Sequence, residues 1–167
     1  MSANKSIKYT VIILSVVVLF AMPLVYFDYV HTWKYVAEFD EYEPDFENIV
    51  EYLLEKYPDE ANRWFSVSVT DSKGRNLYDP EINDLLNLPD DVRLSLETIC
   101  DFGFPDKDSN LDTISISGNR VTFGIVNGEY ALVYSPGEIP KWVNDASEKE
   151  RPYIRKINSN WYHVTKR

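Results

Sequence analysis

Cysteine and histidine are scarce in this chain, and their scarcity excludes several kinds of site. Cys100 is the only cysteine among 167 residues, so no disulfide can form within the chain and a hydrophobic core must stabilise the fold. The two histidines, His31 and His163, lie far apart and lack neighbouring cysteines or an HExxH pattern. The sequence therefore contains no recognisable set of zinc ligands.

Motifs for catalysis and nucleotide binding are also missing. The chain contains no G-x-S-x-G sequence, and its six glycines are too scattered to form a phosphate-binding loop. Cys100 falls on the apolar stripe of an expected helix, which favours a buried thiol over a nucleophile. Because aspartate and glutamate are abundant, a cell-envelope hydrolase that uses Asp and Glu residues is the alternative function, although no pair of carboxylates stands out.

Charge is absent from residues 9–27. As a helix that rises about 1.5 Å per residue, this run would measure about 28 Å, close to the thickness of the hydrocarbon core of a bilayer. A lone segment in lipid must be helical to satisfy its own backbone hydrogen bonds. We therefore predict a transmembrane helix with the lipid bilayer as its partner. A cleaved signal peptide is the alternative, but the bulky Leu19 at the −3 position of the best cleavage site argues against it.

Basic residues favour one orientation of this helix. The first eight residues contain Lys5 and Lys8 and no acid. In residues 28–45, by contrast, Lys34 is the only lysine or arginine. Lysine and arginine are enriched in cytoplasmic flanks, so the expected location is the cell membrane with the N-terminus in the cytoplasm. The predicted parts are a cytoplasmic tail (1–8), the transmembrane helix (9–27), a juxtamembrane linker (28–43) and an extracytoplasmic domain (44–167).

Negative charge dominates the part after the anchor. The whole chain has a formal net charge of −10, and leaving out Lys5 and Lys8 brings the remainder to −12. Such a surface repels phosphate backbones, so the sequence predicts no nucleic-acid partner. The acidic run over 38–47 is interpreted as a solvated entry to a helix, with attraction of a cation or a basic partner as the alternative.

The domain shows helical spacing twice. Pro44 and its neighbouring acids predict a helix start, and Pro58 predicts its end. Between them, apolar residues recur at helical intervals at Phe46, Ile49, Val50, Leu53, Leu54 and Tyr57. A second helix is predicted from Pro89 to Gly103, with Val92, Leu96, Ile99 and Cys100 on one stripe. A short helical piece over 82–86 is also expected.

Alternating apolar and polar residues predict strands in the rest of the domain. These segments are 64–70, 112–117, 121–125, 129–135, 153–157 and 161–165, with brief pairing over 76–78. Asn127-Gly128 is a hairpin signal, and the short connections favour antiparallel pairing. The expected fold class is α+β, with two helices packed on an antiparallel sheet of about five strands.

Two groups of side chains are candidate binding sites. Oxygen ligands alternate at Asp106, Asp108, Asn110 and Asp112, as in a calcium loop, but the glycine and the bidentate glutamate of an EF-hand are missing. We therefore predict no cofactor and interpret the segment as a polar loop, with a weak calcium site as the alternative. Large rings on the strands form the second group. The aromatic contact face is predicted at Trp64, Tyr130, Tyr134, Trp142, Trp161 and Tyr162, because tyrosine and tryptophan dominate binding hot spots. Packing in the core and on the surface of the sheet is the other interpretation of these rings.

The end of the chain carries a resemblance. Tyr134-Ser135-Pro136 in one strand and Asn160-Trp161-Tyr162 in the last strand resemble the tails of small uncharacterised bacterial proteins that are anchored by a membrane segment or a lipid. The resemblance covers the last third of the chain and implies a bacterial origin but no activity. The sequence thus predicts a single-pass membrane protein whose extracytoplasmic domain contacts a protein or ligand. An accessory subunit whose anchor packs against other membrane helices is a further alternative.

Overall fold

The computed structural model describes residues 22, 38–58, 61–70, 74–101, 111–125, 130–137 and 152–165. The chain separates into two compact units, Met1–Ala37 and Glu38–Arg167, and the elements below all belong to the second. Apart from residue 22, the predicted transmembrane helix over 9–27 lies outside the described residues. Within the described ranges, no helix is both long and apolar enough to cross a bilayer.

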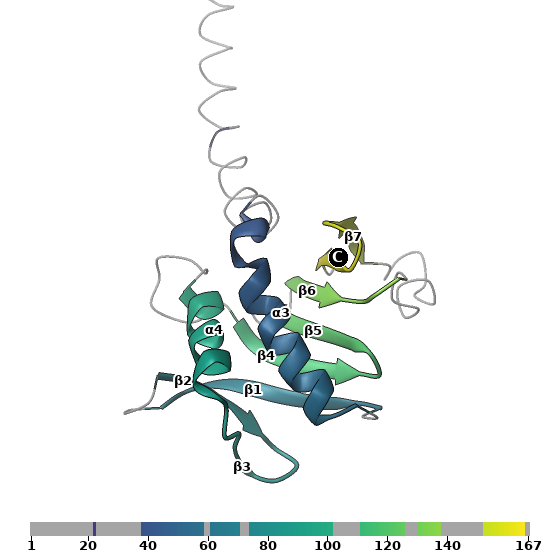
Figure 1. Cartoon of the computed structure of the whole chain (residues 1–167). Coiled ribbons are helices and arrows are strands. Elements are labelled where there is room, and N and C mark those ends of the chain that lie inside the picture. The colour runs from purple at the N-terminus through teal and green to yellow at the C-terminus, as the bar shows by residue number, and fades with distance from the viewer. Residues whose placement is uncertain are drawn as a thin grey trace, which may run out of the picture. The chain divides into compact units, whose positions relative to one another are not determined.

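The second unit is an α+β domain, as predicted (Figure 1). Its described elements are α3 (Phe39–Lys56), β1 (Arg63–Thr70), β2 (Gly74–Asp79), β3 (Asp84–Leu85), α4 (Asp90–Asp101), β4 (Leu111–Ser117), β5 (Arg120–Ile125), β6 (Tyr130–Tyr134), β7 (Tyr153–Lys156) and β8 (Trp161–Thr165). Figure 1 shows α3 lying across one face of the sheet with α4 beside it.

Helix α3 begins at Phe39, five residues before the predicted start at Pro44, which lies inside the helix. Tertiary packing explains the earlier start. The ring of Phe39 is fully buried, with its centroid 5.6 Å from that of Phe46 and 5.1 Å from that of Trp161. Burying a phenylalanine stabilises by about 1.5–3 kcal/mol, and with the ring contacts of Phe39 this offsets the cost of about 3 kcal/mol of a proline inside a helix.

The sheet has eight strands rather than about five, in the order β3-β2-β1-β4-β5-β6-β8-β7, and all printed pairings are antiparallel. Among the described strands, β3 is the one that was not predicted as a strand. Residues 82–86, expected as a short helical piece, instead contain this two-residue strand, whose Leu85 pairs with Tyr78 of β2. At the other edge, the predicted strands over 153–157 and 161–165 form the hairpin of β7 and β8, and β8 pairs with β6. A strand of two residues is too short to show an alternating pattern.

The face of the sheet beneath α3 holds the main core. One row of paired residues crosses five strands on this face and consists of Phe65, Ile114, Phe123, Leu132 and His163. All five side chains are buried. Four rings from α3, β5 and β8 form the aromatic cluster, defined as Phe39, Phe46, Phe123 and Trp161. Helix α4 buries the predicted stripe, Val92, Leu96, Ile99 and Cys100.

The opposite face is divided into two halves. Over β6, β8 and β7 it carries a small apolar cluster of Val133, Tyr162 and Val164, with Ala131 and Ile154 packed against it. Over β1, β4 and β5 its side chains are small, polar and half-buried, namely Ser66, Thr113, Ser115 and Thr122. Gly124 belongs to this polar half because a Cβ there would lie 2.5 Å from the hydroxyl of Thr113. The polar half is therefore the open face of the sheet.

A side-chain clamp joins the start of α3 to the last hairpin. The amide nitrogen of Asn158 donates to the carboxylate of Glu43 at 2.7 Å, and its amide oxygen accepts from the backbone N–H groups of Asn160 and Trp161 at 3.0 and 3.1 Å. Asn158→Ala removes all three bonds, so we expect the free energy of unfolding to fall by about 2 kcal/mol. Denaturant titration of the full chain measures this, with the neighbouring exposed Ser159→Ala as the control that should change it by less than about 0.5 kcal/mol.

His163 makes the stability depend on pH. Its side chain is 1 % exposed, and burial, with the positive charge of Arg155, lowers its pKa to about 4 from 6.5. Because the unfolded chain binds this proton more readily, the contribution of neutral His163 is fully present above pH 6.5 and is lost as the pH falls to about 4. The loss amounts to about 3 kcal/mol. Denaturant titrations from pH 7 to 4 should show this dependence in wild type and not in His163→Gln; equal slopes would contradict it.

Candidate ligand groove on the open face of the sheet

A groove of about 310 Å³ lies at the end of the open face, over β1, β4 and β5. Its lining consists of Asn62, Arg63, Trp64, Ser115, Ile116, Ser117, Arg120 and Thr122. Ligand pockets commonly measure about 300–1,000 Å³, so this groove is large enough for one small group. We refer to it as the Trp64–Arg120 groove.

Strand register brings these residues together. Trp64 of β1 pairs with Ser115 of β4, which pairs with Thr122 of β5, so the three side chains form one row on the open face. The next row contains Ser117 and Arg120, which pair across the β4–β5 turn. The small hydroxyl side chains beside Trp64 cannot cover its ring, and the ring remains 51 % exposed.

Arg120 supplies the positive charge of the groove. Partial burial lowers the pKa of its guanidinium, which remains charged at neutral pH because arginine titrates far above it. No hydrogen bond or ion pair links Arg120 to another side chain in the described ranges. The lining also contains no aspartate or glutamate, although acids far outnumber bases in the chain. The groove is thus a locally basic site on an acidic domain.

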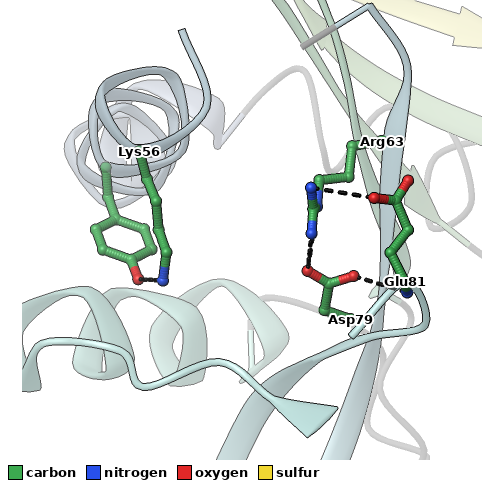
Figure 2. Close-up of polar contacts among 5 residues, drawn as sticks. Lys56, Arg63, Asp79 and Glu81 are labelled. Carbon is green, nitrogen blue, oxygen red and sulfur yellow. Dashed lines mark hydrogen bonds and ion pairs between the residues drawn. The ribbon is translucent and has the colours of Figure 1, made fainter. Parts of the chain in front are cut away.

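The second arginine of the lining, Arg63, is held by carboxylates (Figure 2). Its Nη2 and Nε donate to Oδ2 of Asp79 at 2.7 and 3.1 Å, and its Nη1 lies 3.1 Å from Oε2 of Glu81. The backbone N–H of Glu81 donates to Oδ1 of Asp79, whose side chain is fully buried. The guanidinium carbon also lies 4.5 Å from the centre of the Tyr57 ring, at the end of α3. This network fixes the start of β1, and with it the position of Trp64.

A hydrolytic role for Asp79 is not supported by its geometry. Asp79 has no exposed surface and its oxygens are occupied by Arg63 and by a backbone N–H, so a substrate cannot reach it. Nearby, the ammonium group of Lys56 donates to the hydroxyl of Tyr52 at 2.9 Å. Burial lowers the pKa of Lys56, but this hydrogen bond and the electrostatic influence of Tyr52, Tyr57 and Asp79 outweigh it and raise the pKa, so Lys56 remains protonated. These contacts serve the fold rather than acid–base chemistry.

Asp79→Asn tests the structural role of the Arg63 network. The substitution removes the negative charge that pairs with the largely buried guanidinium of Arg63, and we expect the free energy of unfolding to fall by about 3–5 kcal/mol. Glu81 is half-exposed, so the matched variant Glu81→Gln should lower it by less than about 1 kcal/mol. Denaturant titrations of both variants at neutral pH measure the difference. If both variants lost the same free energy of unfolding, Asp79 would not be the main partner of Arg63.

The described members of the predicted contact face do not share one surface. Trp161 is fully buried in the aromatic cluster, and Tyr162, the next residue of β8, is buried on the opposite face. Tyr134 is half-buried, with its ring 5.3 Å from that of Trp161. Only Trp64 presents an exposed ring. The side chain of Tyr130 and the whole of Trp142 lie outside the described residues.

The predicted calcium loop falls mostly outside the described residues. Only Asp112 is described, as a half-buried residue of β4 next to a register shift; Asp106, Asp108 and Asn110 are not. Among the described residues, no three His, Cys, Asp or Glu side chains form a group that could hold a metal ion. Cys100 is buried, as its place on the apolar stripe predicts.

Sequence reasoning missed Arg120, Ser115 and Thr122 as neighbours of Trp64. The predicted strands over 112–117 and 121–125 are joined by a short connection, and counting back from it pairs Ser115 with Thr122 and Ser117 with Arg120. The pairing of β1 with β4, which adds Trp64, joins segments separated by β2, β3 and α4 and leaves no local signal.

The groove offers an aromatic ring, a guanidinium and four neutral polar side chains, Asn62, Ser115, Ser117 and Thr122. None of its lining residues is a histidine, carboxylate, lysine or cysteine that could act as a base for a serine nucleophile. This arrangement is suited to binding. Comparisons of the chain with protein-family models, curated proteins and solved structures found no match.

Proposed function

We propose that this chain is a single-pass membrane protein whose extracytoplasmic domain binds a ligand or protein partner in the Trp64–Arg120 groove. In this proposal residues 1–8 lie in the cytoplasm, residues 9–27 cross the bilayer and the domain lies outside. The charge-free run and the lysines that precede it support the anchor and its orientation.

One observation carries the binding role: a half-exposed tryptophan and an arginine without a described partner line the same groove. A single exposed apolar side chain is common on protein surfaces and needs no explanation. An exposed tryptophan that shares a groove with an arginine does indicate a binding site, because both residue types are enriched at binding hot spots. The Arg63 network holds the start of β1 in place, so the groove is formed before any ligand arrives.

Thiol labelling tests location and occupancy together. Cys100 is buried, so Ser115→Cys places an accessible thiol in the groove and Leu94→Cys places one on the exposed side of α4. A membrane-impermeant maleimide is applied to intact cells and to the purified full chain. We expect Leu94→Cys to react at the same rate in both, and Ser115→Cys to react several-fold more slowly in cells, because the partner covers it.

The wild-type chain is the blank for slow reaction at Cys100. Labelling of Leu94→Cys only after cell lysis would contradict the extracytoplasmic location. Equal rates for Ser115→Cys in cells and in the purified chain would contradict occupancy of the groove, whatever the result for Leu94→Cys.

A further inference from the structure

The geometry points to an acidic sugar, a pyranose ring that carries one carboxylate, as the ligand of the Trp64–Arg120 groove. This inference rests on the proposed function and adds the chemical class of the ligand. Three properties of the lining support it: the guanidinium of Arg120, the half-exposed ring of Trp64 and a surround of neutral hydrogen-bonding groups.

The guanidinium of Arg120 selects a carboxylate. Arginine presents a planar fork of N–H donors that matches the two oxygens of a carboxylate, and such charge-assisted bonds are roughly twice as strong as neutral ones. Partial burial of Arg120 removes some of the competing water. No acid lines the groove to compete for the guanidinium.

The charge of the domain limits the ligand to few negative charges. Residues 28–167 carry a formal net charge of −12, which repels polyanions such as polyphosphates over distances up to the Debye length. One carboxylate can be neutralised by Arg120, since the other arginine of the lining, Arg63, is held by Asp79 and Glu81. A ligand with several charges would have to place the others against an acidic surface.

Trp64 selects a ring with an apolar face. The electron-rich face of an aromatic ring attracts C–H groups, and the half-exposed indole of Trp64 leaves part of its surface open to such a partner. The C–H groups of a pyranose gather on its faces while its hydroxyl groups point outward around the rim. Stacking on Trp64 would therefore direct the sugar hydroxyls to the edge of the groove.

The remaining lining matches hydroxyl groups. Asn62, Ser115, Ser117 and Thr122 each both donate and accept hydrogen bonds, as sugar hydroxyls do. A peptide segment is the competing ligand. It brings a chain of amides that must be paired in order, whereas the groove, at about 310 Å³, has room for one small group. The sugar matches the guanidinium of Arg120, the ring of Trp64 and the neutral polar side chains of the lining.

Titration of the full chain with small probes tests the ligand class. The chain is labelled with ¹⁵N in its tryptophans and held in a zwitterionic detergent without a sugar headgroup, and the indole N–H signal of Trp64 is assigned with Trp64→Phe. The probes are glucuronate, glucose, acetate and acetyl-phenylalanine. We expect glucuronate to shift the Trp64 signal saturably, with a Kd at least about tenfold lower than that of any other probe.

Variants identify the groups responsible. Arg120→Gln should weaken glucuronate binding at least about tenfold, because a charge-assisted hydrogen bond is lost. Arg120→Lys, which keeps the charge without the fork, should weaken it less. Lys156→Gln removes a cation of β7 outside the groove and should leave the Kd unchanged. An unchanged indole signal from buried Trp161 shows that each variant is folded.

Several results would overturn the inference. No saturable shift with glucuronate, or equal affinity for glucose, would exclude an acidic sugar. Tighter binding of acetyl-phenylalanine with the same dependence on Arg120 would assign the groove to a peptide carboxylate instead. None of these results alters the labelling rates of Ser115→Cys, so the ligand class and the proposed function can fail separately.

Discussion

The packing of α3 against the last strand is the interaction on which the domain depends. Phe39 and Phe46 of the helix meet Phe123 and Trp161 of the sheet, with ring centroids 5.0–5.9 Å apart. Rings at these separations gain contact energy beyond the area that they bury. The cluster starts the helix at Phe39, fills the centre of one face of the sheet and is reinforced at its rim by the bond between Asn158 and Glu43.

The main core lies on one face of the sheet, and the side chains on the other face change in character from one edge of the sheet to the other. Over β6, β8 and β7 the second face is apolar and buried; over β1, β4 and β5 it is lined by small hydroxyl side chains. Trp64 lies in the second region, and its neighbours across the strands are too short to cover it. The Arg63 network, on the other side of β1, holds the strand that carries this ring. Arg63 and Trp64 are adjacent in β1, so the network that holds Arg63 also holds the exposed ring of Trp64 in place.

Sequence patterns predicted the elements better than their partners. The α+β class, the stripe of α4 and the strands other than β2 and β3 follow from the periodicity of apolar residues. The start of α3 was placed too late, because Pro44 is a strong local signal and the packing of Phe39 is not local. Strand β3 was expected as helix, since two residues hold no period.

Of the residues that line the Trp64–Arg120 groove, the sequence identified only Trp64 as a candidate. Trp161 and Tyr162 are adjacent in one strand, so their side chains must point to opposite faces, and alternation alone argued against a shared contact surface. Trp64 was identified as an aromatic on a strand. Its partners were not, because the order of β1 beside β4 depends on contacts between distant segments. Arg120 had no motif to mark it.

The clamp between Glu43 and Asn158 joins residues 115 positions apart, and this span has a consequence for biosynthesis. A ribosome completes α3 long before it adds the hairpin that covers the helix, and until then Phe39 and Phe46 have no strand partner from β8. Long-range contacts of this kind form late and slow the folding of a chain. A transcript that ends before Trp161 yields a polypeptide with an exposed aromatic helix, a surface that chaperones and quality-control proteases bind.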